Sequence, residues 1–290
     1  MFRRKTFHLR LPSRTLVLGE RTLVMGVLNV TPDSFSDGGL YRSAGSAVAH
    51  ALEIERGGAD ILDIGGESTR PGSKGISVEE ELARVLPVVE ALRSKLKIPI
   101  SIDTQKAAVA DAAIAAGAEM INDVSALRTE PALGEVARRR RVPVILMHMR
   151  GTPRDMQKRP FARDVVRDVL AGLRAAVARA RKAGLKREQI VLDPGIGFGK
   201  NYQQNYELLA HLDRLARLGY PILVGTSRKT FLGATLARDG EPAPASERIW
   251  GTAATVTAAI LGGAHIVRVH DVAEMVQVVR TADALLQGGR

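Results

Sequence analysis

Eight short apolar segments recur along the chain, and sequence with helical periodicity separates each from the next. Segments of this length that are rich in isoleucine, valine and leucine are typical of strands buried on both faces of a parallel sheet. An open sheet usually has fewer strands, so the pattern favours a closed α/β structure, the TIM (β/α)8 barrel. The segments are residues 22–28, 61–64, 99–103, 120–124, 144–148, 190–193, 222–225 and 265–269.

The barrel pattern divides the 290 residues into three parts of one domain. Residues 1–21 are predicted to contain a short N-terminal β-hairpin, because apolar and polar residues alternate on both sides of a turn. Residues 22–271 form the predicted barrel core, and residues 272–290 a C-terminal helix. Ser77 and Glu80 have the spacing of a capping box, which predicts a helix start at this point.

Polar residues stand at or just after the ends of the predicted strands. The carboxyl ends of all eight strands of such a barrel meet at one mouth, so residues far apart in sequence become neighbours there. Burying these groups without a ligand would cost free energy, so as a set they indicate a site for a polar ligand. They are Asn29, Asp63, Asp103, Asn122, His148, Asp193, Ser227, Arg228, Lys229, Arg268 and His270. A single strand-end aspartate is more often a helix cap, and His148 is interpreted as a structural histidine.

Composition limits the classes of partner. The formal net charge is +11, and its densest patch is the run Arg138 to Arg141. That run ends a predicted helix, where cations interact favourably with the helix dipole. Aromatic residues are only 4% of the chain, too few for many base-stacking platforms. The surplus charge therefore favours small anionic ligands over nucleic acid.

The chain has no cysteine, which excludes disulfides, thiolate catalysis and cysteine-based zinc sites. The basic start at Arg3, Arg4 and Lys5 is not followed by the apolar stretch of a secretory signal. No apolar run approaches the ~18 residues of a membrane span. We therefore expect a cytoplasmic protein with no membrane partner.

One glycine-rich segment, residues 195–200 (GIGFGK), superficially resembles a phosphate-binding loop. It is one residue too short for the nucleotide pattern, and Asn201 stands where that pattern has serine or threonine. It also lacks the third glycine of a dinucleotide-binding fingerprint. The segment is therefore not predicted to bind a nucleotide.

Eight motifs, taken together and in order, closely resemble the dihydropteroate synthase family of pterin-binding enzymes. They are MGVLNVTPDSFSDGG (25–39), DIGGESTRPGS (63–73), SIDT (101–104), INDV (121–124), LMHM (146–149), LDPGIGFGK (192–200), GTSRK (225–229) and RVHD (268–271). The resemblance implies the barrel fold and the condensation of 6-hydroxymethyl-7,8-dihydropterin diphosphate with 4-aminobenzoate, giving 7,8-dihydropteroate and diphosphate. It also implies assistance by Mg²⁺ and a homodimer.

The resemblance implies a role for each motif residue. The residues expected to bind the pterin are Asp63, Asp103, Asn122, Met147, Asp193 and Lys229. Those expected to bind the diphosphate are Asn29, Thr69, Arg70, Arg268 and His270, with Asn29 as the Mg²⁺ ligand. Those expected to contact 4-aminobenzoate are Phe35, Thr69, Pro71, Phe198 and Ser227, the last at a helix amino terminus. Asn29, Asp103, Lys229, Arg268 and His270 are the expected catalytic residues.

Three alternatives stay open at this stage. A pterin-binding methyltransferase would share the barrel and the aspartate and asparagine pocket, but not the STRPG and SRK motifs found here. An inactive synthase-like paralogue with another pterin-related role would keep the same motifs. A nucleic-acid-binding protein is supported by the net charge alone.

Overall fold

The structure is a computed structural model that describes residues 4–31, 39–69, 72–152, 154–156, 160 and 162–288. A two-stranded antiparallel hairpin, β1 (Phe7–Arg10) and β2 (Thr15–Leu18), precedes an eight-stranded parallel sheet in the order β8-β7-β6-β5-β4-β3-β10-β9. Its strands are β3 (Leu23–Asn29), β4 (Ile61–Gly65), β5 (Ile100–Asp103), β6 (Met120–Asp123), β7 (Val144–Met147), β8 (Ile190–Asp193), β9 (Leu223–Val224) and β10 (Ile266–Val269).

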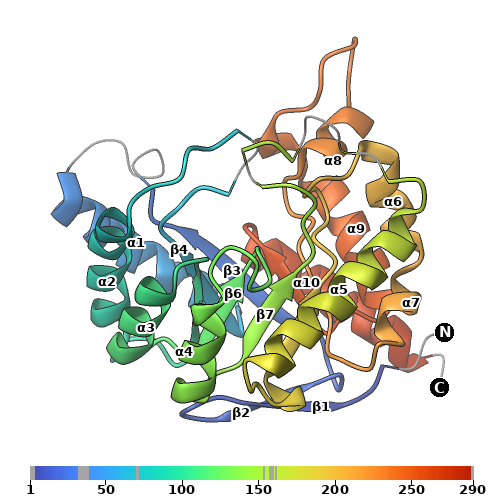
Figure 1. Cartoon of the computed structure of the whole chain (residues 1–290). Helices are drawn as coiled ribbons and strands as arrows, with labels where there is room; N and C mark the ends of the chain where they lie inside the picture. The colour runs from blue at the N-terminus through green and yellow to red at the C-terminus, as the bar shows by residue number, and fades with distance from the viewer. Residues whose placement is uncertain are drawn as a thin grey trace.

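The sheet closes on itself between its two outer strands. A parallel bridge joins Leu192 in β8 to Ile222, which lies directly before β9, and the Leu192 N–H donates to the Pro221 carbonyl at 2.9 Å. Helices surround the resulting barrel (Figure 1). The TIM-barrel fold and the N-terminal hairpin predicted from sequence are therefore confirmed.

The helices lie between the strands and follow the last strand, and two short 3₁₀ segments accompany them. They are α1 (Gly39–Arg56), α2 (Val78–Leu92), α3 (Ala107–Ala116), α4 (Ala132–Arg140), α5 (Val165–Lys182), η2 (Arg187–Gln189), α6 (Tyr202–Ala210), α7 (Leu212–Ala216), α8 (Thr230–Thr235), η3 (Ala245–Glu247), α9 (Ile249–Leu261) and α10 (Val272–Gly288).

Local sequence signals explain several helix ends. The Ser77 hydroxyl accepts the Glu80 N–H and caps α2, as the sequence predicts. The Glu80 carboxylate does not complete the predicted capping box, because it pairs with Arg84 one turn later. The run of arginines does end α4, where Arg141 adopts a left-handed φ of 58° and closes the helix.

Alternation along the strands builds the barrel interior in layers, because residues two apart on a strand face the same side. The lowest layer, here called the floor, is a buried apolar cluster that strand residues form with Leu9, Leu11 and Leu18 of the hairpin segment. Its strand members are Leu23, Met25, Ile61, Met120, Ile145, Val191, Leu223 and Ile266. The intervening strand residues belong instead to the cluster formed with the surrounding helices. The hairpin therefore covers the amino-terminal end of the barrel, at the bottom of Figure 1.

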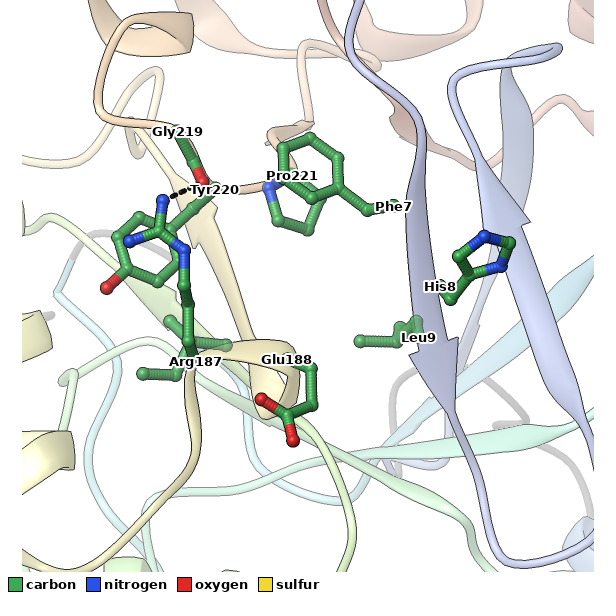
Figure 2. A pocket seen from close by; sticks show the side chains of 9 residues that line it. Phe7, His8, Leu9, Arg187, Glu188, Gly219, Tyr220 and Pro221 are labelled. Atoms are coloured by element: carbon green, nitrogen blue, oxygen red, sulfur yellow. Dashed lines mark hydrogen bonds between the residues drawn. The ribbon is translucent and has the colours of Figure 1, made fainter.

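A cavity of about 130 Å³ separates part of the hairpin from the amino-terminal ends of β8 and β9 (Figure 2). Its walls are mainly apolar, with Phe7, Leu9 and Tyr220 among them. Its cation, Arg187, is engaged already: the guanidinium donates to the Gly219 carbonyl at 2.6 Å and lies 4.5 Å from the centre of the Tyr220 ring. We interpret this cavity as a packing gap beneath the hairpin.

Within the described part of the chain, no helix is both long enough and apolar enough to cross a membrane.

His265 links the N-terminal segment to the barrel and is 2% exposed. Its Nδ1 accepts the Ile222 N–H at 3.1 Å, so its Nε2–H donates to the Lys5 carbonyl at 3.1 Å. Burial, opposed by that carbonyl, lowers the pKa of His265 to about 4. Since an unfolded histidine titrates near pH 6.5, the unfolded chain binds the extra proton first as the pH falls.

We expect the His265 contribution to the free energy of unfolding to be complete above about pH 6.5 and to be lost between about pH 6.5 and 4. A His265→Gln variant cannot titrate, so its stability deficit relative to the wild type should shrink by about 2 kcal/mol between about pH 7 and pH 4.5. Urea unfolding at both pH values measures this change. His50→Gln, at an exposed histidine in α1, is the control, and an equal shrinkage there would contradict the assignment.

Candidate active site

The polar strand-end residues form the layer directly above the apolar floor. Each lies two residues after a floor position on its strand: Asp63 follows Ile61, Asn122 follows Met120 and Arg268 follows Ile266. The same spacing places Met147 and Asp193 on β7 and β8 at this level. Strand periodicity therefore gathers these side chains inside the mouth of the barrel.

Arg268 is the centre of this layer. Its Nε donates to Asp63 Oδ2 at 2.7 Å and its Nη2 to Asp103 Oδ2 at 2.9 Å. Asn122 Nδ2 also donates to Asp63 Oδ2, at 3.0 Å. Asp63 Oδ1 is buried and has no hydrogen-bond partner among the residues that the structure describes. A buried acceptor left in this state is costly, and a ligand N–H would satisfy it.

Two carboxylates in the layer have perturbed acidity. Burial raises the pKa of Asp103 to about 7, and the Arg268 guanidinium opposes part of that rise. Burial also raises the pKa of Asp193. The Gly195 N–H, which donates to Asp193 Oδ1 at 2.7 Å, opposes this rise. Carboxylates in a desolvated, partly neutralised pocket are a common property of functional sites.

Lys229 faces the layer from the segment between β9 and α8. Its Nζ donates to the Ile196 carbonyl at 2.5 Å and lies 4.1 Å from the centre of the Phe198 ring. Burial lowers the pKa of Lys229 to about 8, while Asp193 opposes the shift. Met147 packs with Val124, Met149 and Met156, and Phe198 lies against this apolar group.

Ser227 and His270 form a pair at the rim. The Ser227 hydroxyl contacts His270 Nδ1 at 3.0 Å and accepts the His270 N–H at 3.2 Å. The prediction that Ser227 lies at a helix amino terminus is wrong, because α8 begins at Thr230 and its cap position is Lys229. Burial and the positive charge of the nearby Arg268 both lower the pKa of His270, to about 3. This imidazole is therefore neutral near pH 7.

Two further predicted residues, Asn29 and Thr69, lie toward the opening of the barrel. Asn29 ends β3, in register with Gly65 of β4, and Thr69 is half-buried in the β4–α2 loop. Phe35, Arg70 and Pro71 lie outside the described residues. Their predicted contacts with the diphosphate and 4-aminobenzoate stay predictions, as do the roles assigned to the residues of the polar layer.

Sequence reasoning missed two groups that organise the site. Lys200 is 3% exposed and contacts the β8–α6 loop from inside, although its segment fails as a nucleotide motif. Lys106 pairs with Glu67 and Glu81, and Arg84 donates to the Gly66 carbonyl at 2.8 Å, so both cations hold the start of the β4–α2 loop. The available signal for Lys200 was its place at the end of the glycine-rich segment, whereas Lys106 and Arg84 are distant in sequence from the loop that they contact.

Gly195 shows how closely the β8–α6 loop approaches β7. Its φ is 65°, and a Cβ at this position would lie 1.9 Å from the His148 carbonyl oxygen. Gly240 also has a positive φ, 84°, but a Cβ there would meet nothing within 4 Å. We expect Gly240→Ala to cost about 1 kcal/mol of stability and Gly195→Ala more than about 4 kcal/mol. Equal losses in denaturant unfolding would show that backbone strain alone explains Gly195.

The chain matches known proteins over almost its whole length. Residues 25–270 match the family model described as pterin binding enzyme. Dihydropteroate synthase from Synechocystis is 52% identical over 267 residues, which cover 92% of this chain and 91% of that protein. The chain belongs to the dihydropteroate synthase family. The comparisons therefore confirm the family predicted from the motifs.

Two solved structures from Xanthomonas albilineans agree with this assignment. Dihydropteroate synthase with 4-aminobenzoic acid superimposes with a TM-score of 0.89 at 45% identity, covering 97% of this chain and 99% of that chain. The same enzyme in complex with 7,8-dihydropteroate gives a TM-score of 0.85 at 43% identity, covering 96% of this chain and 98% of that chain.

The donor set constrains how a metal ion could bind. In the part of the chain that the structure describes, no three histidine, aspartate or glutamate side chains gather in a metal-binding arrangement. Mg²⁺ commonly uses one or two protein oxygens and completes its shell with water and substrate phosphates. The amide oxygen of Asn29 at the rim is a suitable single ligand of this kind, so the residues present fit a substrate-borne Mg²⁺.

Proposed function

We propose that the chain is a dihydropteroate synthase that condenses 6-hydroxymethyl-7,8-dihydropterin diphosphate with 4-aminobenzoate to give 7,8-dihydropteroate and diphosphate. The observation that carries the proposal is the inward-facing layer of Asp63, Asp103, Asn122 and Asp193 around Arg268, in a chain 52% identical to a dihydropteroate synthase. Such a layer offers several oxygen acceptors within a small desolvated space. A pterin edge, with its adjacent N–H donors, needs this arrangement.

The pterin would lie in the deep layer. A carboxylate that accepts two parallel N–H groups provides both energy and orientation, and the unpartnered Oδ1 of Asp63 supplies one such acceptor. Lys229 would donate to the pterin carbonyl and ring nitrogen from the opposite side. The thioether of Met147, 3% exposed, would contact the flat face of the ring.

The diphosphate would lie above the pterin, near Asn29, Thr69 and His270. Arg268 is the half-buried cation at the centre of the deep layer, and it would stabilise charge that grows on the departing diphosphate. Mg²⁺, when bound, supplies further positive charge to the phosphate oxygens, with Asn29 as its protein ligand. His270, being neutral near pH 7, would donate or accept a hydrogen bond rather than contribute charge.

Bond breaking would precede bond making. The carbon–oxygen bond breaks with its electron pair leaving on the diphosphate, and the methylene cation that remains is tolerated by the carboxylates of Asp103 and Asp193. The amine lone pair of 4-aminobenzoate then forms the carbon–nitrogen bond, and the nitrogen proton passes to water. A weakly basic aromatic amine is unprotonated near neutral pH, so no general base is assigned.

Assembly and location belong to the same proposal. We propose a homodimer that uses the start of α9, where Trp250 is 78% exposed. A cytoplasmic location agrees with a chain that contains no cysteine. Light scattering coupled to size-exclusion chromatography measures the mass in solution, and loss of the dimer in Trp250→Lys would locate the interface.

The decisive experiment is direct. Purified protein is mixed with 6-hydroxymethyl-7,8-dihydropterin diphosphate, 4-aminobenzoate and Mg²⁺, and dihydropteroate and diphosphate are quantified together. Equal amounts of both products, absent when either substrate is omitted, are the expected result. Binding of the pterin diphosphate without product would contradict catalysis and favour a pterin-binding paralogue. Omitting Mg²⁺, with and without Asn29→Ala, tests the metal assignment.

A further inference from the structure

Lys200 is a buried basic residue outside the reaction described above. Its Nζ contacts four acceptors: Gly195 O at 2.8 Å, Phe198 O at 2.9 Å, His148 O at 3.3 Å and His148 Nδ1 at 3.1 Å. Three of these are main-chain carbonyls, two from one short loop and one from the end of the neighbouring strand. A lysine ammonium has three donors and no acceptor, so this group suits a ring of carbonyls.

The backbone of the β8–α6 loop explains why these carbonyls converge. Gly195, Gly197 and Gly199 have φ values of 65°, 85° and 66°, a conformation that other residues rarely adopt. With these left-handed residues the loop presents the Gly195 and Phe198 carbonyls to one side, where their oxygens lie close together and accept from a shared donor. Lys200 supplies that donor from within the loop.

The outer side of the same loop contacts Lys229. The Ile196 carbonyl accepts the Lys229 ammonium and the Phe198 ring lies under it, so both contacts of Lys229 come from residues between Gly195 and Lys200. Gly197 N–H donates to Asn205 Oδ1 at 2.6 Å and joins the loop to α6. The buried Lys200 thus supports the segment that contacts the half-buried Lys229.

We propose that Lys200 is a positioning residue for pterin binding, holding the β8–α6 loop so that the Ile196 carbonyl and the Phe198 ring aim Lys229 into the site. The inference deepens the proposed function and rests on it. Lys200 itself contacts neither substrate, because its Nζ is enclosed by the loop and by His148.

His148 provides a neutral partner for this lysine. Its Nδ1 accepts from Lys200, and its Nε2 lies 3.6 Å from Asp168 Oδ2 on α5. Burial and the nearby Lys200, Arg128 and Arg150 lower the pKa of His148 to about 2. The imidazole therefore does not compete as a second cation at neutral pH, and the structural interpretation of His148 agrees with its surroundings.

A double-mutant cycle separates positioning from a purely structural role. Lys200→Met keeps an unbranched side chain, one atom shorter, and removes the donors, while Lys229→Met removes the group that we infer to be positioned. With Lys229 intact we expect Lys200→Met to weaken binding of the pterin diphosphate roughly 10- to 100-fold. In the Lys229→Met background the same change should weaken binding less than about 3-fold. Fluorescence titration with 6-hydroxymethyl-7,8-dihydropterin diphosphate measures all four dissociation constants without turnover.

Equal factors in both backgrounds would overturn the proposal, since they would mean that Lys200 does not act through Lys229. Lys182→Met, at an exposed lysine in the last turn of α5, is the matched control and should change no dissociation constant. If Lys200→Met fails to fold, Lys200→Gln retains two donors and replaces it in the cycle.

Amide hydrogen exchange of the ligand-free protein gives an independent readout. We expect exchange in residues 195–199 to be about 10-fold faster in Lys200→Met, with the β3 to β6 strands unchanged. Unchanged exchange in the loop would also overturn the proposal. Wild-type protein that binds the diphosphate substrate without forming dihydropteroate would contradict the proposed reaction alone, because both readouts here are independent of turnover.

Discussion

Lys229→Met is expected to lower kcat/KM for the pterin diphosphate by about 100- to 1,000-fold, the effect of removing one preorganised donor from a desolvated site. Methionine offers no donor in place of the Lys229 ammonium, which contacts the Ile196 carbonyl and the Phe198 ring. Steady-state kinetics over about pH 6 to 9.5 measure the change. The basic limb of the wild-type profile, near the Lys229 pKa of about 8, should vanish in the variant.

Lys229→Arg is the matched control for charge. Arginine stays protonated above pH 8, so the basic limb should move to higher pH while part of the activity remains. If kcat/KM of Lys229→Met stayed within about 3-fold of the wild-type value, the proposed role of Lys229 in the site would be contradicted.

Arg268→Met is expected to have a larger effect, about 1,000-fold on kcat/KM, because it removes the cation that two buried carboxylates share. The pKa of Asp103, about 7 in the wild type, should rise further, since Arg268 is the group that opposes its desolvation. The Asp103 carboxyl group would then be ionised only at higher pH. The acidic limb of kcat/KM should accordingly move to higher pH.

Arg268→Lys keeps the charge but loses the two-pronged geometry, so it should retain the wild-type acidic limb and lose only part of the rate. An acidic limb that stays in place in Arg268→Met would contradict the electrostatic link between Arg268 and Asp103. In that case the loss of rate would reflect contact with the diphosphate alone.

The fold could be predicted from sequence because each layer of the barrel repeats with the same period. The strand residues that face the barrel interior can be recognised by their spacing. An apolar residue at Ile61, Met120 or Ile266 is followed two positions later by a polar one on the same side of the strand. The family motifs then indicated the chemistry. No long-range information was needed to place Asp63, Asn122 and Arg268 at one level.

Pairings within the site could not be predicted in the same way. Strand-end position shows that Arg268 and Asp103 are neighbours, but not that the arginine predicted for the diphosphate also bonds the carboxylates predicted for the pterin. The family resemblance implies a helix start at Ser227, whereas the helix begins three residues later. Lys200 depends on carbonyls turned inward by three glycines, a geometry that composition does not specify.

The hairpin also determines from which end of the barrel a ligand can enter. Leu9, Leu11 and Leu18 close the end opposite the mouth. A ligand at the level of Asp63 therefore lies at the bottom of the site. Of the residues predicted for 4-aminobenzoate, Thr69 lies in the loop beyond β4, nearer the opening than Asp63 on that strand. A molecule bound first near the opening would obstruct a second one that has to bind deeper, so we expect the pterin diphosphate to bind before 4-aminobenzoate. We expect the product to leave through the same opening, because the hairpin closes the other end of the barrel.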